Sequence, residues 1–290
     1  MVIIVIDELF DKFNGAFAEN TERAYRADFE VFAQWCRIND YDPYNTTGEQ
    51  YAQFIEFEAE TKTTATIRRR IGSLASIFKL LQINDPTKHP DAILALKRLH
   101  RQKGSQQKQA EPLTEHVLLQ LLKACSDDIV GQRDRILLKL GYETMRRRSE
   151  LCQFKFEDLL QLPNGKYAIR LNFSKTDQFG KGKIVPISEE LYQDLEVWKD
   201  QVGEGYILRS ISRYKNPNQS LNPASINRIL KRLQNNSSLH LNSELSGHSF
   251  WVGKALDLLM NGESLEKIML RGGWAAESTA MRYLREWNFE

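Results

Sequence analysis

Residues 246–274, SGHSFWVGKALDLLMNGESLEKIMLRGGW, contain the features around which the rest of the chain can be interpreted. His248 stands directly before an amphipathic run with the spacing of a helix. The large, uncharged Trp251 follows the histidine by three residues, and two glycines precede Trp274. Taken singly, His248 fits a helix-cap histidine and Trp274 a packing residue. Any function therefore has to come from their combination with residues elsewhere.

Composition limits the possibilities. The 290 residues suffice for one large domain or two ordinary ones, and 41% hydrophobic with 27% charged residues is typical of soluble globular proteins. The three scattered cysteines fit neither a disulfide framework nor a metal cluster, which favours a reducing compartment. The apolar start, residues 1–6, is too short for a signal or a membrane span. We expect a cytoplasmic protein with no membrane partner.

Charge is informative through its distribution, because the net charge is only +2. Arginines form runs at 68–70 and 146–148, and Lys175, Lys181 and Lys183 crowd one short segment. A run of charges is most often a solvated face, so these clusters alone do not identify a partner.

The first part of the chain has the pattern of an all-helical domain. Apolar residues recur at helical spacing in four segments, and Asn20 or Thr21 is a plausible cap for the first. The segments are 20–40, 47–60, 63–83 and 89–101, the last opened by Pro90. A polar, Gln-rich stretch without periodicity follows. We therefore predict a helical domain at 1–105, a linker at 106–112 and a second domain at 113–290.

The second domain is predicted to be α+β. Helical segments at 113–125, with Thr114 as N-cap, and 131–154 precede the one good β pattern, in which 166–173 alternates and 183–187 follows as a hairpin partner. The remainder is predicted to be helical. The expected fold class is mainly α with a small β-sheet.

Five elements occur in a fixed order in this second domain. Arg147 lies three residues before Glu150, at a predicted helix-to-strand corner, and Lys175 lies 28 residues after Arg147 in the predicted hairpin loop. His248 is followed by Trp274 after 26 residues and by Tyr283 after nine more. Over about residues 113–285 this order and spacing resemble the tyrosine recombinase (phage integrase) family. Residues 1–105 match only in helical character, as that family's SAM-like core-binding domain.

The resemblance implies a site-specific recombinase that breaks and rejoins double-stranded DNA through a covalent 3′-phosphotyrosine. A tyrosine hydroxyl can hold the phosphate covalently, a guanidinium can stabilise the charge that develops on it, and a lysine can protonate the leaving oxygen. The implied roles are nucleophile for Tyr283, phosphate clamp for Arg147, general acid for Lys175, phosphate binding or proton transfer for His248, indole donor to the phosphate for Trp274, and orientation of Arg147 or His248 for Glu150. The chemistry needs no metal or cofactor, and none is expected.

The same resemblance predicts partners and location. Arg68, Arg69, Arg70, Arg101 and Lys103 are the expected phosphate contacts of a two-domain clamp, with Lys108 in the linker as a further one. Recombination of two duplexes predicts a tetramer assembled on DNA. The protein is expected to be bacterial, nucleoid-associated and encoded by a phage or plasmid.

Trp251 departs from the family pattern, which has a second phosphate-binding arginine at this position. A tryptophan has one donor and no charge. Trp251 is therefore interpreted as a packing residue, and Arg146 or Arg148 as a possible replacement for the missing cation. Met145 and Arg146 also stand where the family usually has glycine and an apolar residue.

Two alternatives stay open. One is a DNA-binding accessory protein of the same fold with weak or lost catalysis, and the other is a relaxing enzyme of the type IB topoisomerase kind.

Overall fold

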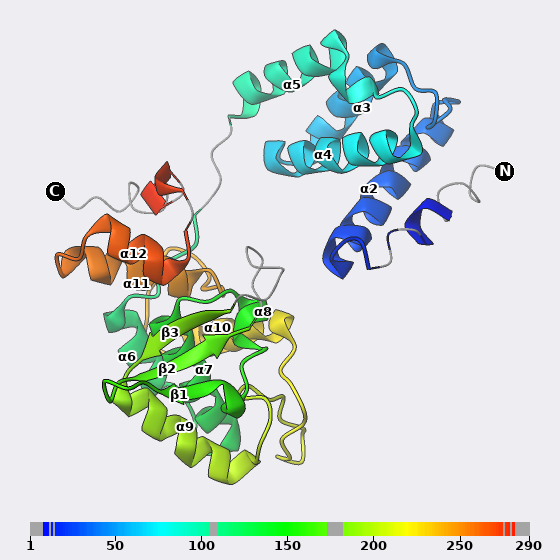
Figure 1. Cartoon of the computed structure of the whole chain (residues 1–290). Coiled ribbons are helices and arrows are strands. Elements are labelled where there is room, and N and C mark those ends of the chain that lie inside the picture. Colours follow the sequence, from blue (N-terminus) through cyan, green and yellow to red (C-terminus); the bar gives the residue numbers. More distant parts are fainter. Residues whose placement is uncertain are drawn as a thin grey trace. The chain divides into compact units, whose positions relative to one another are not determined.

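The structure is a computed structural model that describes residues 8–11, 13, 15–104, 109–172, 182–274, 276–278 and 280–281. Contacts divide the chain into two compact units, residues 1–108 and 109–290 (Figure 1). Each unit has its own hydrophobic core, and each is described by itself.

The N-terminal unit consists of helices, as predicted. They are α2 (Glu19–Ile38), α3 (Gly48–Thr61), α4 (Thr64–Leu81) and α5 (Pro90–Lys103), with a 3₁₀ turn at Pro86–Lys88. Aromatic side chains of three helices meet in the core, where Phe32 contacts Phe54 and Phe78 edge to face. The predicted cap of the first helix is wrong, because α2 begins at Glu19 after Ala18. Helix α3 does carry a capping box, in which Thr47 and Gln50 exchange hydrogen bonds.

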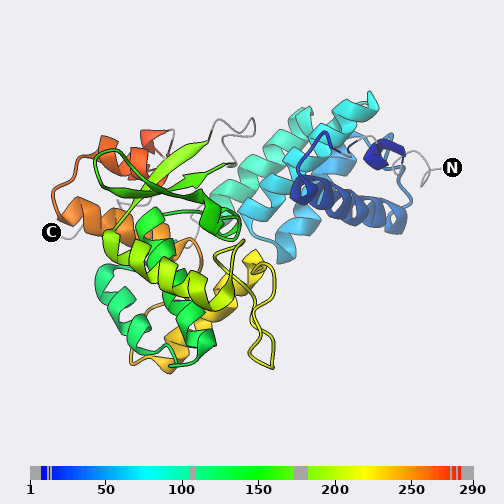
Figure 2. The ribbon, with the colours of Figure 1, turned by 60° about the horizontal axis from the view of Figure 1, so that its bottom comes forward.

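The C-terminal unit contains a small antiparallel sheet. Its strands are β1 (Leu159–Gln161), β2 (Tyr167–Leu171) and β3 (Lys183–Ile187), with β2 in the middle (Figures 1 and 2). The predicted hairpin is confirmed, and Ile169 pairs with Val185 across it. Strand β1 was not predicted, because three residues are too few to display an alternating pattern. A mainly helical fold with one small sheet is confirmed.

The unit also contains the helices that bear on the site. They are α6 (Glu115–Lys123), α7 (Ile129–Thr144), α8 (Arg148–Leu151), α9 (Glu189–Val202), α10 (Pro223–Asn236), α11 (Ser249–Met260) and α12 (Leu265–Gly272). Helix α7 is central, because α6, α9, α11 and β3 all pack on it. The position of α7 therefore fixes where the residues after its C-terminal end lie.

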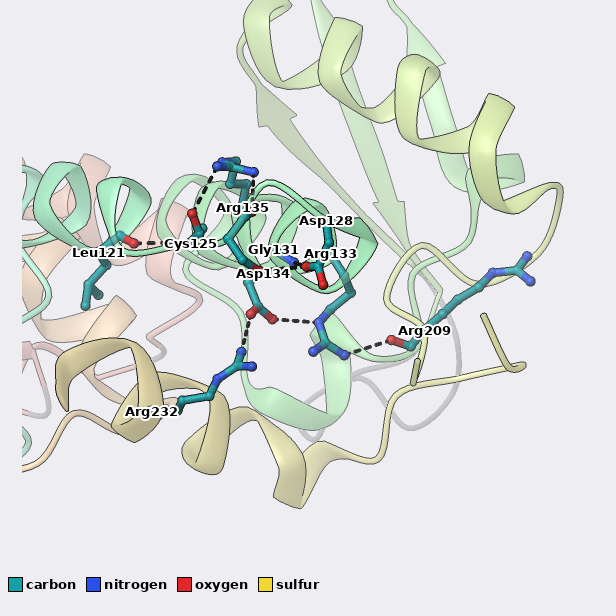
Figure 3. A network of polar contacts seen from close by, with 10 residues as sticks. Leu121, Cys125, Asp128, Gly131, Arg133, Asp134, Arg135, Arg209 and Arg232 are labelled. Atoms are coloured by element: carbon teal, nitrogen blue, oxygen red, sulfur yellow. Dashed lines mark hydrogen bonds and ion pairs between the residues drawn. The ribbon is translucent and has the colours of Figure 1, made fainter. Parts of the chain in front are cut away.

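A buried polar network fastens α7 to α10 (Figure 3). The carboxylate of Asp134 accepts from Arg133 Nε at 2.7 Å and from Arg232 of α10. The guanidinium of Arg133 also donates to the carbonyl of Arg209 at 3.1 Å. Arg133 and Asp134 are both buried, so the network compensates their charges where water is excluded.

Two glycines bring α11 close to its neighbours. A Cβ on Gly141 of α7 would lie 2.8 Å from the Phe250 ring, and a Cβ on Gly253 would lie 1.9 Å from the carbonyl oxygen of Leu113. Leu113 in turn donates its N–H to the carbonyl of Ser249 at 3.0 Å. A larger residue at Gly141 would push the start of α11, and with it His248, away from α7, and a larger residue at Gly253 would push α11 away from Leu113.

Candidate active site

Arg147 lies at a sharp corner between two helices. Helix α7 ends at Thr144, and the buried Met145 takes the left-handed conformation at φ 53°. Arg147 then precedes the short helix α8, and Glu150 accepts both its backbone N–H at 3.1 Å (Oε2) and its Nη1 at 2.9 Å (Oε1). The sequence predicted a helix followed by a strand at this corner. The second element is instead the helix α8, so that part of the prediction is wrong. The spacing of three is nonetheless the one that lets Glu150 hold Arg147 at both ends.

Trp251 lies at the centre of the predicted site residues. The Arg147 guanidinium carbon is 5.2 Å from the centroid of the Trp251 ring, within the range of a cation–π contact. The ring of His248 lies 5.3 Å from that of Trp251, and the ring of Trp274 lies 4.8 Å from it. Trp251 is 7% exposed. Residues 147, 248 and 274, distant in sequence, are thus brought together around one indole.

Burial and positive charge set the electrostatics of this cluster. Burial, and then the charge of Arg147, lower the pKa of His248, which favours a neutral imidazole. Burial also lowers the pKa of Lys183, with Arg146 adding to the effect and Glu150 opposing it. Arg146, Arg147 and Lys183 thus lie around a single carboxylate, Glu150, among the residues that the structure describes. Such a surplus of positive charge favours the binding of an anion.

Arg146 and Arg148, the two predicted replacements for the missing cation, lie in different surroundings. Arg146 is 4% exposed, and its guanidinium donates to the backbone carbonyls of Thr144, at 2.7 Å, and of Arg271. Arg148 is exposed, and its side chain runs across Gly247, where a Cβ would lie 2.1 Å from its Cγ.

Two predicted catalytic residues, Lys175 and Tyr283, lie outside the described residues, and their roles stay predictions. Strand β2 ends at Leu171 and strand β3 begins at Lys183, so the described strands flank the segment that carries Lys175.

The predicted DNA contacts of the N-terminal unit separate into two groups. Arg68, Arg69, Arg101 and Lys103 are exposed, although Arg69 is ion-paired with Asp28, and Lys108 lies outside the described residues. Arg70 is 8% exposed and is ion-paired with both Asp28 and Glu58 inside the unit. This is not the exposed position that a DNA contact requires. The reason is helical spacing, which places Arg70 on the face of α4 that Ile67 and Leu74 bury in the core.

Comparison with known proteins identifies the class. The model of the phage integrase family matches residues 111–288, and the chain belongs to this family. Among curated relatives, an integrase/recombinase XerD homolog of Selenomonas ruminantium is 27% identical, covering 93% of this chain and 83% of its own length. The recombinase Cre of Escherichia phage P1 is 22% identical, covering 95% of this chain and 86% of its own length.

Solved structures agree in fold. A lambda integrase (residues 75–356) bound as a dimer to a COC′ core site superposes with a TM-score of 0.69 at 16% identity, covering 99% of this chain and 96% of that one. The XerH recombinase in a post-cleavage complex with a palindromic difH substrate gives a TM-score of 0.67 at 18% identity, over 91% of this chain and 76% of that one.

Two further features of the described residues concern membranes and metal ions. None of the helices they form is both long and apolar enough to cross a membrane. Within the same residues, no group of three or more His, Cys, Asp or Glu side chains is arranged to hold a metal ion.

Proposed function

We propose that this protein is a site-specific DNA recombinase that breaks and rejoins DNA through a covalent 3′-phosphotyrosine at Tyr283. Membership of the phage integrase family supports the proposal. The observation that carries it is the cluster of Arg147, His248 and Trp274 around Trp251, with more cations than carboxylates. This arrangement suits a phosphodiester, which is an anion that gains charge on its non-bridging oxygens when it is attacked.

In the proposed reaction the Tyr283 oxygen forms a bond to phosphorus and the bond to the 5′ oxygen breaks. The Tyr283 proton leaves as the bond forms, and a neutral His248 can take it. Lys175 supplies a proton to the departing oxygen, and Arg147, held by Glu150, stabilises the charge on the phosphate. Reversal with a second DNA end restores the tyrosine and joins the new strands, so the bond energy is conserved.

The wider assignment is part of the same proposal. The exposed Arg68, Arg101 and Lys103 contact the DNA backbone, and four protomers assemble on two duplexes. The lambda integrase tetramer bound to a Holliday junction supports this assembly by analogy. We also propose that residues 1–105 form a core-binding domain and residues 113–290 a catalytic domain, and the division of the chain into two compact units supports these bounds. The phage relative supports an origin in a bacterial phage or plasmid.

Trapping the covalent intermediate tests the proposal. Suicide substrates made from the DNA that flanks the gene are expected to give a protein–DNA adduct with the parent and none with Tyr283→Phe, which should still bind DNA. Tyr214→Phe, at an exposed tyrosine of the same unit, is the matched control and should form adduct normally. Undiminished adduct in Tyr283→Phe would refute the assignment. Relaxation of supercoiled plasmids that lack the site would instead indicate a type IB topoisomerase activity.

A further inference from the structure

The C-terminal end of α12 is closed in a way that fixes Trp274. Gly273 takes the left-handed conformation at φ 71°, and the N–H of Trp274 donates to the carbonyl of Met269 at 3.0 Å. The Gly273 N–H also donates to the carbonyl of Met269, so the helix ends in an αL cap with the 6→1 bond of a Schellman motif, which sets the direction of the next residue. Gly272 belongs to the same arrangement, because a Cβ there would lie 3.1 Å from the Trp274 ring.

The next two carbonyls of the last turn are taken by cations from other elements. Lys183 Nζ of β3 donates to the carbonyl of Leu270, and Arg146 Nη2 donates to the carbonyl of Arg271. A Cβ on Gly273 would lie 3.2 Å from Arg146 Nη1 and 3.8 Å from Lys183 Nζ. The carbonyl end of a helix lacks internal partners and carries partial negative charge, so two cations there are favourable.

Arg146 also connects this helix end to the phosphate clamp. It is the immediate neighbour of Arg147, and its Nε is anchored to the carbonyl of Thr144 at the end of α7. Trp274, which directly follows the two glycines, packs on Trp251, and Trp251 receives the guanidinium of Arg147. A displacement of the end of α12 would therefore move Trp274 relative to Arg147.

We propose that Arg146 and Lys183 are positioning residues that hold the C-terminal end of α12 and thereby set Trp274 against Trp251 and Arg147. The contribution of this clamp to catalysis rests on the recombinase function proposed above. The clamp, meaning the hydrogen bonds of Arg146 and Lys183 to the end of α12, is present in the free protein, so it can be tested without DNA.

Hydrogen exchange of the free full-length protein tests the clamp directly. Arg146→Met and Lys183→Met each remove a charged donor, and such a hydrogen bond is worth enough to lower the protection of amides 269–274 by about tenfold to a hundredfold. Lys267→Met removes an exposed cation from the first turn of the same helix and should leave that protection unchanged. Arg146→Lys keeps the charge but cannot bond both carbonyls, so its protection should be intermediate.

The outcomes separate the clamp from the function. Unchanged protection of 269–274 in both methionine variants, with α7 still protected, would overturn the clamp whatever the activity. If the clamp serves catalysis, single-turnover adduct formation in Arg146→Met should fall by about tenfold to a hundredfold at unchanged DNA affinity. Lost protection with adduct formation at the parent rate would overturn the positioning role. Lost protection in a protein whose parent forms no adduct would support the clamp and refute the recombinase function.

Discussion

The two runs of three arginines, residues 68–70 and 146–148, are identical in sequence, but they differ in how far nearby carboxylates neutralise their charge. In the N-terminal run, the buried Arg70 binds both Asp28 and Glu58, and Arg69 also reaches Asp28. In the C-terminal run, the buried Arg146 binds backbone carbonyls, while Arg147 shares Glu150 with the surrounding cations.

The difference shows what decides the role of an arginine run. Two carboxylates match the two arginines of the first cluster, so it is neutral and holds helices together. Three cations lie near one carboxylate in the second, among the residues described, so it retains positive charge, which suits the phosphate site proposed there. The elements that fold against each run supply the difference, and the run itself does not contain it.

The largest expected effect is on Arg147. Arg147→Ala should lower single-turnover adduct formation by about 10³–10⁵, because a cation aimed at a phosphoryl transition state contributes that much. The assay uses saturating protein, so that altered affinity does not enter. Arg37→Ala, at an exposed arginine of α2, is the control and should match the parent. A loss below tenfold would mean that the surplus charge of the second cluster is not used on the phosphate.

A substitution in the neutral cluster should instead change the free energy of unfolding. Arg70→Met leaves Glu58 buried without its cation and leaves Asp28 with Arg69 alone, so it should reduce the free energy of unfolding by about 3–5 kcal/mol. Urea unfolding of the full chain, followed by circular dichroism, measures it. The exposed neighbour provides the control, because Arg68→Met should change stability by no more than about 0.5 kcal/mol. Equal effects of the two substitutions would remove the contrast between a buried and an exposed arginine in one run.

Much of the fold could be predicted from the sequence because periodicity reflects which face is buried. Helices α2–α5 and the β2–β3 hairpin were found in this way. Strand β1 was not, because three residues have no measurable period. The single helix predicted over 131–154 is wrong in its second half, because the chain turns after Thr144 and the four residues of α8 form a separate helix. Arg70 was expected to be exposed because a charge run suggests a solvated face. Its position between Ile67 and Leu74 was the signal that could have corrected this.

The site was predictable only as far as the motif reaches. Arg147, His248 and Trp274 were chosen by order and spacing, and the structure brings these three together. The contacts of Arg146 and Lys183 with the end of α12 could not be read in the sequence, because they depend on how β3 and α12 pack. The central position of Trp251 was likewise beyond the motif, which has an arginine there.

Trp251 offers a way to increase the charge of the second cluster. Trp251→Arg should speed single-turnover adduct formation by about tenfold, a floor below the ~10²–10³ that one such donor typically contributes. The new guanidinium adds a donor but removes the ring that faces Arg147. Trp251→Phe keeps an aromatic face without adding charge and should give no gain. If the arginine variant is no faster than the parent, another donor already completes the phosphate site. Arg148, which is exposed, is then the first to remove, because the Arg146 guanidinium is bonded to backbone carbonyls.

The smallest expected effect concerns His248 and comes from the same surplus of charge. Burial, and secondarily Arg147, lower the pKa of His248 in the folded protein below its ordinary value of about 6.5. The unfolded chain therefore binds this proton more readily, so the stability linked to His248 is complete above about pH 6.5 and is lost as the pH falls through the folded pKa. The slope of unfolding free energy against pH that one group contributes cannot exceed about 1.4 kcal/mol per pH unit.

Urea unfolding between pH 5 and 8 should show a slope from His248 in the parent and a shallower slope in His248→Gln. Because burial is the larger cause, Arg147→Met should reduce the slope only in part. A slope unchanged in His248→Gln would place the titration elsewhere, and complete loss in Arg147→Met would make the charge of the cluster, rather than burial, its main cause.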